Sequence, residues 1–215
     1  MSQIEPEPES EEAPIPEEKS PWRFLPTGLS LLRIALIPII YWLSLADKHL
    51  WALVIYCFGA WTDQLDGWLA NRFNWHSYFG ALLDPVADRI YILALIPLLW
   101  HYGSISGIYT TLVITRFSIQ LTAYPVLLLW LKRRPQLRPE WLSRAAMALA
   151  FLILGIGFAE QLAIELIPES TTEEKVFDHT MEALTLIGCI LEVWVLARFL
   201  PRYWDVMRGK EDTFE

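Results

Sequence analysis

Apolar residues dominate six stretches of the sequence, and each stretch is long enough to cross a lipid bilayer as a helix. A transmembrane helix needs about 20 mainly apolar residues. The six stretches cover residues 28–46, 50–70, 79–100, 105–131, 144–167 and 180–200. Between Ile90 and Thr115 no Asp, Glu, Lys or Arg occurs over 26 residues, a run that is hard to place in a soluble core. The pattern predicts an all-α integral membrane protein with six transmembrane helices.

The composition agrees with this fold class. Hydrophobic residues make up 54% of the chain and charged residues 20%, whereas a soluble domain carries about 25% charged residues. Tryptophans sit at or near the ends of the predicted helices, where an amphipathic ring meets the membrane interface: Trp42, Trp51, Trp100, Trp130, Trp141 and Trp204. Two cysteines are too few for a disulfide scaffold, and the lack of a basic surface argues against a nucleic-acid partner.

The first 20 residues differ from the rest of the chain. They hold seven Glu and one Lys, so they contribute −6 of the net charge of −8, and the other 195 residues contribute −2. A Pro- and Glu-rich segment with few residues able to pack is typical of disorder. We therefore predict a disordered acidic tail over 1–22, a six-helix domain over 23–205 and a cytoplasmic C-terminal tail over 206–215.

Lys and Arg are distributed unevenly between the two sides of the predicted bundle. Nine of them fall on the side that holds both termini and the second and fourth loops: Arg23, Arg72, Lys132, Arg133, Arg134, Arg138, Arg202, Arg208 and Lys210. The opposite loops hold only Lys48 and Lys175. Because positive charge is retained on the cytoplasmic side, both termini are predicted to be cytoplasmic. The plain architecture suggests a bacterial inner membrane.

Four aspartates interrupt the second and third apolar stretches. An ionised side chain at the centre of a bilayer costs roughly 2.5–3.5 kcal/mol, so four of them need a reason. Helical spacing places two groups of residues each on one helix face: Asp63, Asp66, Gly67 and Ala70, then Gly80, Asp84 and Asp88. The short link at 71–78 makes the two helices an antiparallel hairpin. Both faces can therefore meet near the cytoplasmic surface.

Carboxylates that converge in this way repel one another unless cations lie between them. Hard oxygen ligands without Cys or His favour Mg²⁺ or Mn²⁺ over Zn²⁺. Four such ligands suit a pair of divalent ions, the arrangement that stabilises transfer of a phosphoryl-type group. Two alternatives stay open. The small residues could simply permit close helix packing, and the aspartates could form a proton or cation path, although they cluster toward one end of the helices.

The acidic motif resembles the signature of the CDP-alcohol phosphatidyltransferases, D-x2-D-G-x2-A-R-x8-G-x3-D-x3-D. Every spacing matches, and seven of the eight signature residues are identical: Asp63, Asp66, Gly67, Ala70, Gly80, Asp84 and Asp88. The departure is Asn71, which stands where the family has Arg, and Arg72 follows it directly. The stretch LPTGLSLLRIALIP at 25–38 is similar to the family's first segment, N-x-P-N-x-L-T-x-x-R, which it keeps only loosely.

The resemblance implies a membrane enzyme, usually a homodimer, that binds a CDP-linked lipid at a site open to the cytoplasm. An acceptor hydroxyl would attack the lipid-bearing phosphate of CDP-diacylglycerol, and CMP would leave. By the same resemblance, two divalent ions are held by Asp63, Asp66, Asp84 and Asp88, and Asp88 is also the base. The CDP-lipid site is implied to include Gly67, Ala70, Asn71, Arg72 and Gly80.

Two arginines bear on the acceptor. Arg116 lies near the middle of the fourth stretch, where a phosphate of the acceptor would suit its charge. An ion pair with Glu160, Glu192 or one of the aspartates is an equally good explanation. Arg133 in the following loop could complete an anion pocket, or could belong to the ordinary cytoplasmic excess of positive charge.

The run GALLDPVADR is similar to the branch of the family that makes phosphatidylglycerophosphate and cardiolipin. We therefore rank glycerol 3-phosphate first as the acceptor, with the glycerol hydroxyl of phosphatidylglycerol as the alternative. A stretch like G-K-x-K-T, frequent in enzymes that make phosphatidylglycerophosphate, is replaced here by PEWLSRAAMALA. Together with Asn71, this leaves a third hypothesis: a lipid-binding relative without turnover.

Overall fold

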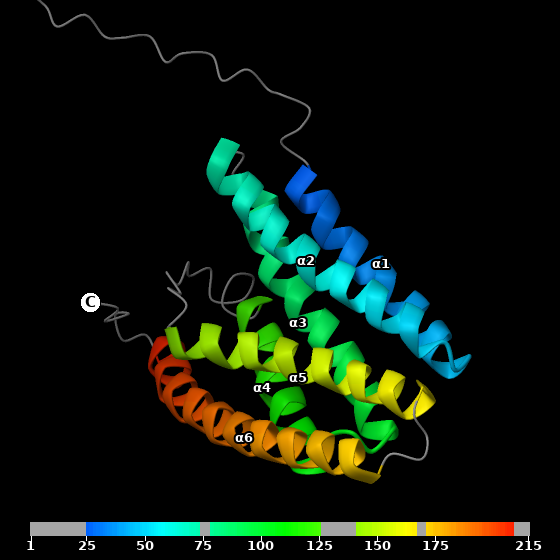
Figure 1. Cartoon of the computed structure of the whole chain (residues 1–215). Helices are drawn as coiled ribbons and strands as arrows, with labels where there is room; N and C mark the ends of the chain where they lie inside the picture. The colour runs from blue at the N-terminus through cyan, green and yellow to red at the C-terminus, as the bar shows by residue number, and fades with distance from the viewer. Residues whose placement is uncertain (1–24, 74–77, 126–140, 167–170, 209–215) are drawn as a thin grey trace, which may run out of the picture.

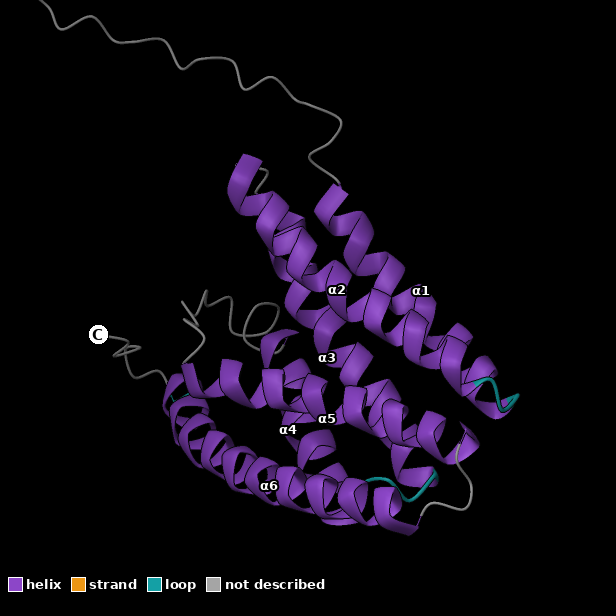
Figure 2. Cartoon of the chain, in the orientation of Figure 1, coloured by secondary structure: helices purple, strands orange, loops and turns teal. Residues whose placement is uncertain are grey.

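Helices make up all the regular structure in the described part of the chain. The computed structural model describes residues 25–73, 78–125, 141–166 and 171–208, and for some of them, including 66–71 and 78–82, the backbone alone. Within these ranges no strand occurs (Figure 2). The helices shown in Figure 1 are α1 (Leu25–Leu45), α2 (His49–Phe73), α3 (Tyr78–His101), α4 (Gly107–Pro125), α5 (Trp141–Leu166) and α6 (Thr171–Met207).

Each helix overlaps one of the predicted stretches, so the all-α fold class is confirmed. Of the predicted stretch 105–131, α4 covers Gly107–Pro125, and residues 126–131 lie outside the described residues. α6 is longer than the predicted 180–200, because hydropathy marks only apolar residues whereas a helix can continue through polar ones that water solvates. α6 thereby includes the first residues of the predicted C-terminal tail. The predicted N-terminal tail lies outside the described residues.

Three helices of the described chain are long and apolar enough to cross a membrane, over Thr27–Leu45, Trp141–Leu166 and Val176–Pro201. Large apolar side chains also cover the outside of the molecule, with Trp42 63% exposed and Trp141 70% exposed. An apolar surface of this extent is unfavourable in water and is expected where a protein faces lipid. The helices and their outer surface are those of an integral membrane protein.

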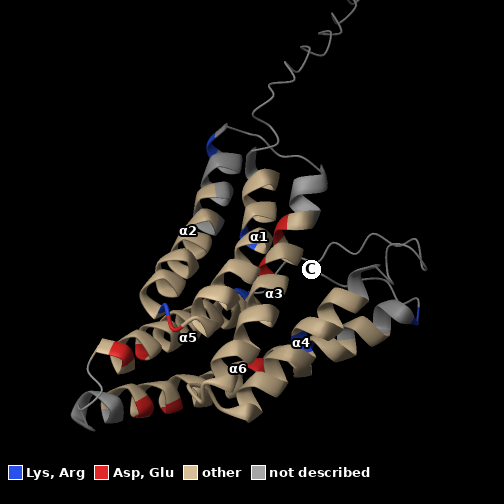
Figure 3. Cartoon of the chain, turned by 90° about the vertical axis from the view of Figure 1, so that its right-hand side faces the viewer, with Lys and Arg blue, Asp and Glu red and all other residues tan. Residues whose placement is uncertain are grey.

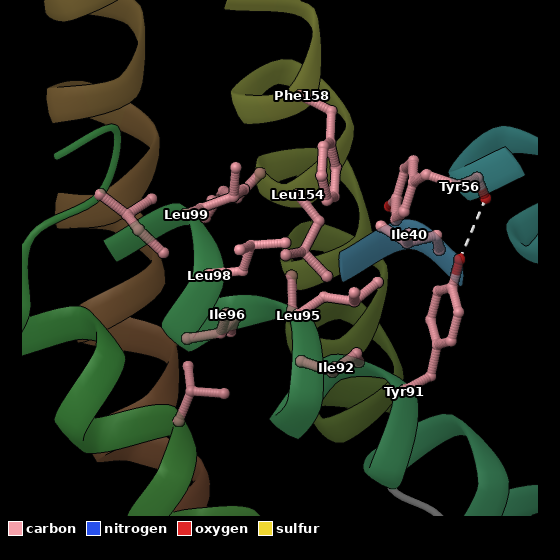
Figure 4. Packing of buried hydrophobic residues seen from close by; sticks show 14 of the residues in the cluster. Ile40, Tyr56, Tyr91, Ile92, Leu95, Ile96, Leu98, Leu99, Leu154 and Phe158 are labelled. Carbon is pink, nitrogen blue, oxygen red and sulfur yellow. Dashed lines mark hydrogen bonds between the residues drawn. The ribbon is translucent and has the colours of Figure 1, made fainter. Parts of the chain in front are cut away.

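α3 lies at the centre of the molecule, where it packs against α1, α4 and α5. Its residues Tyr91, Leu95 and Leu99 are fully buried. They belong to one continuous core that includes Ile40 of α1 and Phe158 of α5 (Figure 4). The helix that carries the second aspartate pair is therefore held on three sides by its neighbours.

Tyrosine hydroxyls tie separate parts of the bundle together. Four of them donate hydrogen bonds to backbone carbonyls distant in sequence: Tyr41 to Ala94, Tyr56 to Phe151, Tyr91 to Tyr56 and Tyr102 to Ser44. A buried hydroxyl without a partner is costly, so each bond satisfies the hydroxyl while its ring fills the core. These bonds link α1 to α3, α2 to α5, α3 to α2, and the end of α3 to the end of α1.

Close packing between α4 and α6 yields a first prediction. A Cβ added at Gly188 of α6 would lie 2.5 Å from the ring of Tyr109 of α4, and the rigid ring cannot yield locally. We expect Gly188→Ala to destabilise the protein by about 1–3 kcal/mol, the usual cost of overpacking. Gly28→Ala is the matched control, because nothing lies within 4 Å of that position. It should leave the thermal unfolding temperature in detergent unchanged or raise it. Equal loss in both variants would contradict the packing described here.

Candidate active site

The candidate site lies where the ends of α1, α2 and α3 come together. The first turn of α1, the last turn of α2 and the first turn of α3 lie at one end of the molecule (Figure 1). Asp63 and Asp66 belong to the second half of α2, and Asp84 and Asp88 to the first half of α3. α1 packs against both of these helices. Figure 3 shows the acidic turns of α3 beside α1.

The two aspartates of α3 are held by two residues of α1. The hydroxyl of Ser30 donates a hydrogen bond to Oδ1 of Asp84 at 2.5 Å. The guanidinium of Arg33 forms an ion pair with Oδ1 of Asp88. Ser30 and Arg33 are fully buried, and the side chain of Asp88 is 14% exposed. Because the two contacts are three residues apart on α1 and four apart on α3, one face of each helix meets the other over a full turn.

Neither Ser30 nor Arg33 was among the site residues predicted from the sequence. Two signals point to them. Arg33 is the only charged residue between Leu25 and Ala46, and both residues lie in the stretch 25–38 that is similar to the family's first segment. A lone charge in an apolar helix needs an anionic partner. Which anion it meets depends on how distant helices pack, and a local pattern does not contain that information.

The α2 half of the motif is located only by its backbone. Asp63, Asp66, Gly67, Ala70 and Asn71 lie in the C-terminal part of α2, and Gly80 lies in the first turn of α3. The side chains of these residues are outside the described set, so the predicted meeting of all four carboxylates stays a prediction. Arg72, in the last turn of α2, is exposed. Arg133 lies outside the described residues.

Arg89 fixes α3 against α4 directly beside Asp88. Its Nε donates to Oε1 of Gln120 at 3.2 Å, and its Nη1 donates to the carbonyl of Pro85 at 2.9 Å. The aspartate pair is therefore placed between a contact to α1 and a contact to α4. The next turn of α3 enters the apolar core, where Tyr91 and Ile92 are fully buried. Asp88 is therefore the acidic residue of α3 that lies nearest to this core.

Arg116, the residue predicted either to bind an acceptor or to form an ion pair, has a carboxylate partner. Its Nε lies 2.8 Å from Oε2 of Glu192 in α6, and the two side chains are 0% and 1% exposed. Of the alternatives given by the sequence, the pair with Glu192 is the one observed. A role for Arg116 in binding the acceptor stays a prediction. In that role, Arg116 would bind the acceptor while it also pairs with the carboxylate of Glu192.

The aspartates of α3 suit a divalent ion by their chemistry. Asp84 and Asp88 offer hard anionic oxygens one helical turn apart, the donor type that Mg²⁺ and Mn²⁺ prefer. Among the side chains that the structure describes, no three His, Cys, Asp or Glu residues come together as a metal-binding group. The predicted site for two ions also includes Asp63 and Asp66 of α2, whose side chains lie outside the described set, so it stays a prediction.

The partly buried acidic pair, its cationic partner and the all-helical bundle agree with a comparison of the whole chain. The sequence model of the CDP-alcohol phosphatidyltransferase family matches residues 23–200. This chain belongs to that family, and the resemblance carried by the aspartate motif is confirmed.

Individual relatives of the chain point to one branch of the family. The chain is 40% identical over 84 residues to proteins named CDP-diacylglycerol–glycerol-3-phosphate 3-phosphatidyltransferase from Salmonella typhimurium strain LT2 and Escherichia coli strain K12. The matched part is 37% of this chain and 46% of each relative, so the chain spans about half the length of the curated relatives it matches. The names of these relatives agree with the branch predicted from the GALLDPVADR run.

Proposed function

We propose that the protein is a membrane enzyme that transfers a phosphatidyl group from CDP-diacylglycerol to glycerol 3-phosphate and releases CMP. The observation that carries this proposal is the pair Asp84 and Asp88, held by buried Ser30 and Arg33 in a chain of the CDP-alcohol phosphatidyltransferase family. Relatives named for this reaction support glycerol 3-phosphate as the acceptor.

In the proposed reaction, the acceptor hydroxyl oxygen forms a bond to the phosphorus that carries diacylglycerol. The bond from that phosphorus to the bridging oxygen breaks, and CMP leaves with the electron pair. Asp88 accepts the hydroxyl proton, so charge and atoms balance. Two Mg²⁺ or Mn²⁺ ions, held by Asp63, Asp66, Asp84 and Asp88, would neutralise the charge that develops on the pyrophosphate.

The remaining residues of the motif would bind the CDP-lipid. Gly67, Ala70 and Gly80 remove side-chain bulk beside the carboxylates, and Asn71 with Arg72 lies at the end of α2, where the nucleotide would enter. The acyl chains can stay in the bilayer beside the helices. Arg116 and Arg133 are proposed to contribute to the acceptor site, Arg116 as a member of its pair with Glu192.

The proposed arrangement in the membrane has six spans, with both termini and the site on the cytoplasmic side of a bacterial inner membrane. Three helices meet the length and composition limits of a span, and the three further helices would complete six crossings. Exposed tryptophans near the ends of the helices support this arrangement. In it, one membrane surface has Trp42, Trp51 and Trp100, and the other has Trp141 and Trp204, where amphipathic rings are expected. By family resemblance we propose a homodimer.

Release of CMP from CDP-diacylglycerol by the purified protein with Mg²⁺ tests the function. We expect release with glycerol 3-phosphate as the acceptor, and little with serine or inositol phosphate. Chelation of the divalent ions should stop the reaction, and Mn²⁺ should restore it. The product should be identified by its mass as phosphatidylglycerophosphate.

One alternative acceptor has an observation in its favour. Pro85 and Arg89 belong to a run that is also similar to cardiolipin synthases of the family, and the carboxylate of Glu192 offsets the charge of Arg116 that a free phosphate would use. Release of CMP with phosphatidylglycerol but not with glycerol 3-phosphate would establish that alternative. No release with any acceptor would identify a lipid-binding relative without turnover.

A further inference from the structure

Arg33 places a positive charge inside the candidate metal site. Its side chain is fully buried, it comes from a different helix than the acidic motif, and it contacts Oδ1 of Asp88. α1 carries no other charged residue over Leu25–Leu45. The site is therefore a group of carboxylates with a permanent cation built into it, since Arg stays protonated under all ordinary conditions.

The buried guanidinium of Arg33 and the partly buried carboxylate of Asp88 both lose hydration, and each is stabilised by the other. Asp88 shares its helical turn with Asp84, and among the described side chains Arg33 is the cation in ion-pair contact with it. Asp84 receives a hydrogen bond from the neutral hydroxyl of Ser30. In the absence of a divalent ion, Arg33 therefore offsets part of the negative charge of the α3 carboxylates.

The same contact has the opposite effect on a divalent ion. An ion that approaches Asp88 meets a carboxylate oxygen already engaged by a cation, and it is repelled by that cation at short range in a medium of low dielectric constant. We propose that Arg33 is a built-in counter-cation of the site: it stabilises the carboxylates when no divalent ion is bound, and it weakens the binding of the ions. The proposal rests on the proposed function, because it presupposes that Asp88 is a metal ligand.

This role makes Arg33 a positioning residue that acts through Asp88. It should keep the carboxylates of α3 in place between turnovers, and it should keep the ions exchangeable. If Arg33 served only to fasten α1 to α3, its replacement by a neutral polar residue would lower stability without tightening the binding of metal.

The experiment measures Mn²⁺ binding to the full-length protein in detergent by electron paramagnetic resonance of the free ion, alongside thermal unfolding with and without Mn²⁺. The test variant is Arg33→Gln, a shorter polar side chain that keeps a hydrogen-bond donor but removes the charge. Arg33→Lys retains the charge. Lys48→Gln is the matched control, because it removes an equal charge at an exposed position after the far end of α1.

We expect Arg33→Gln to bind Mn²⁺ about tenfold more tightly than the wild type, as the loss of a short-range repulsion predicts. Without Mn²⁺, the unfolding temperature of this variant should be lower than that of the wild type. The rise in unfolding temperature on adding Mn²⁺ should be larger than in the wild type. Arg33→Lys and Lys48→Gln should bind as the wild type does. If Arg33→Gln folds only when Mn²⁺ is present during purification, the proposal is supported, and failure to fold in either condition overturns it.

Two other results would overturn the proposal in distinguishable ways. A wild type that binds no Mn²⁺ would remove the proposed metal site itself. A wild type that binds Mn²⁺ with an Arg33→Gln variant of equal or weaker affinity would leave the metal site intact and refute the role of Arg33. In that case, a raised KM for CDP-diacylglycerol would assign Arg33 to direct contact with the substrate instead.

Discussion

Asp84→Asn is expected to abolish phosphatidyl transfer while leaving the protein folded. Asn retains an oxygen in the position of Oδ1, so the hydrogen bond from Ser30 at 2.5 Å can persist. The variant loses one negative charge from the proposed ligand set. Charge stabilisation by bound metal contributes several kcal/mol to such reactions, so we expect turnover to fall by about a thousandfold or more at roughly 1.4 kcal/mol per factor of ten.

The measurement is CMP release under saturating Mg²⁺, with thermal unfolding as the check on folding. Asp47→Asn is the matched control. Asp47 lies in the turn between α1 and α2 with its side chain 90% exposed, and its φ of 54° is one that Asn adopts readily. This control should keep full activity. An Asp84→Asn protein that retains substantial turnover would contradict the metal assignment.

Arg116→Ala is expected to destabilise the protein severely, and Glu192→Ala should do so to a similar degree. Either change leaves one fully buried charge without its partner 2.8 Å away, which typically costs about 3–5 kcal/mol. Replacement of both residues, as in Arg116→Met with Glu192→Leu, should recover most of the loss, because a buried ion pair contributes little more than an apolar pair of similar volume.

Thermal unfolding of the two single variants and the double variant in one detergent gives the coupling between the two positions. If the losses of stability in the two single variants add up in the double variant, Arg116 and Glu192 do not stabilise the protein as a pair. The double variant also separates the two hypotheses about Arg116. If Arg116 contributes to the acceptor site, a folded double variant should show a raised KM for glycerol 3-phosphate and an unchanged KM for CDP-diacylglycerol.

The helices could be predicted from the sequence because lipid-facing and core-facing residues are both apolar, so each helix appears as one long stretch. The residues at which each helix begins and ends are harder to predict. The polar beginning of α6, with Glu173 and Glu174, has no hydropathy signal, yet the helix begins at Thr171. For the same reason, the boundary between the last helix and the predicted C-terminal tail lay within the helix.

The acidic half of the site on α3 was visible in the sequence because its i, i+4 spacing is a local property. Its partners on α1 were not. Ser30 and Arg33 lie 54 and 55 residues away from the aspartates they contact, and only the packing of α1 on α3 brings them together. For the same reason, the sequence alone offers several partners for Arg116: Glu160, Glu192 or one of the aspartates. It does not contain the information that α4 packs against α6.

The pair of Arg33 and Asp88 bears on how the protein is made. In the proposed six-span arrangement, α1 leaves the ribosome well before α3, and an arginine alone in hydrocarbon costs roughly 2.5–3.5 kcal/mol. α1 carries this charge before Asp88, the contact that lies 55 residues further along, has been synthesised. The first helix is long and apolar enough to cross a membrane, but this charge makes its insertion less favourable until α3 follows. The insertion of α1 and that of α3 are thereby coupled, and nascent chains that end before Asp88 should hold α1 in the membrane less stably than longer ones.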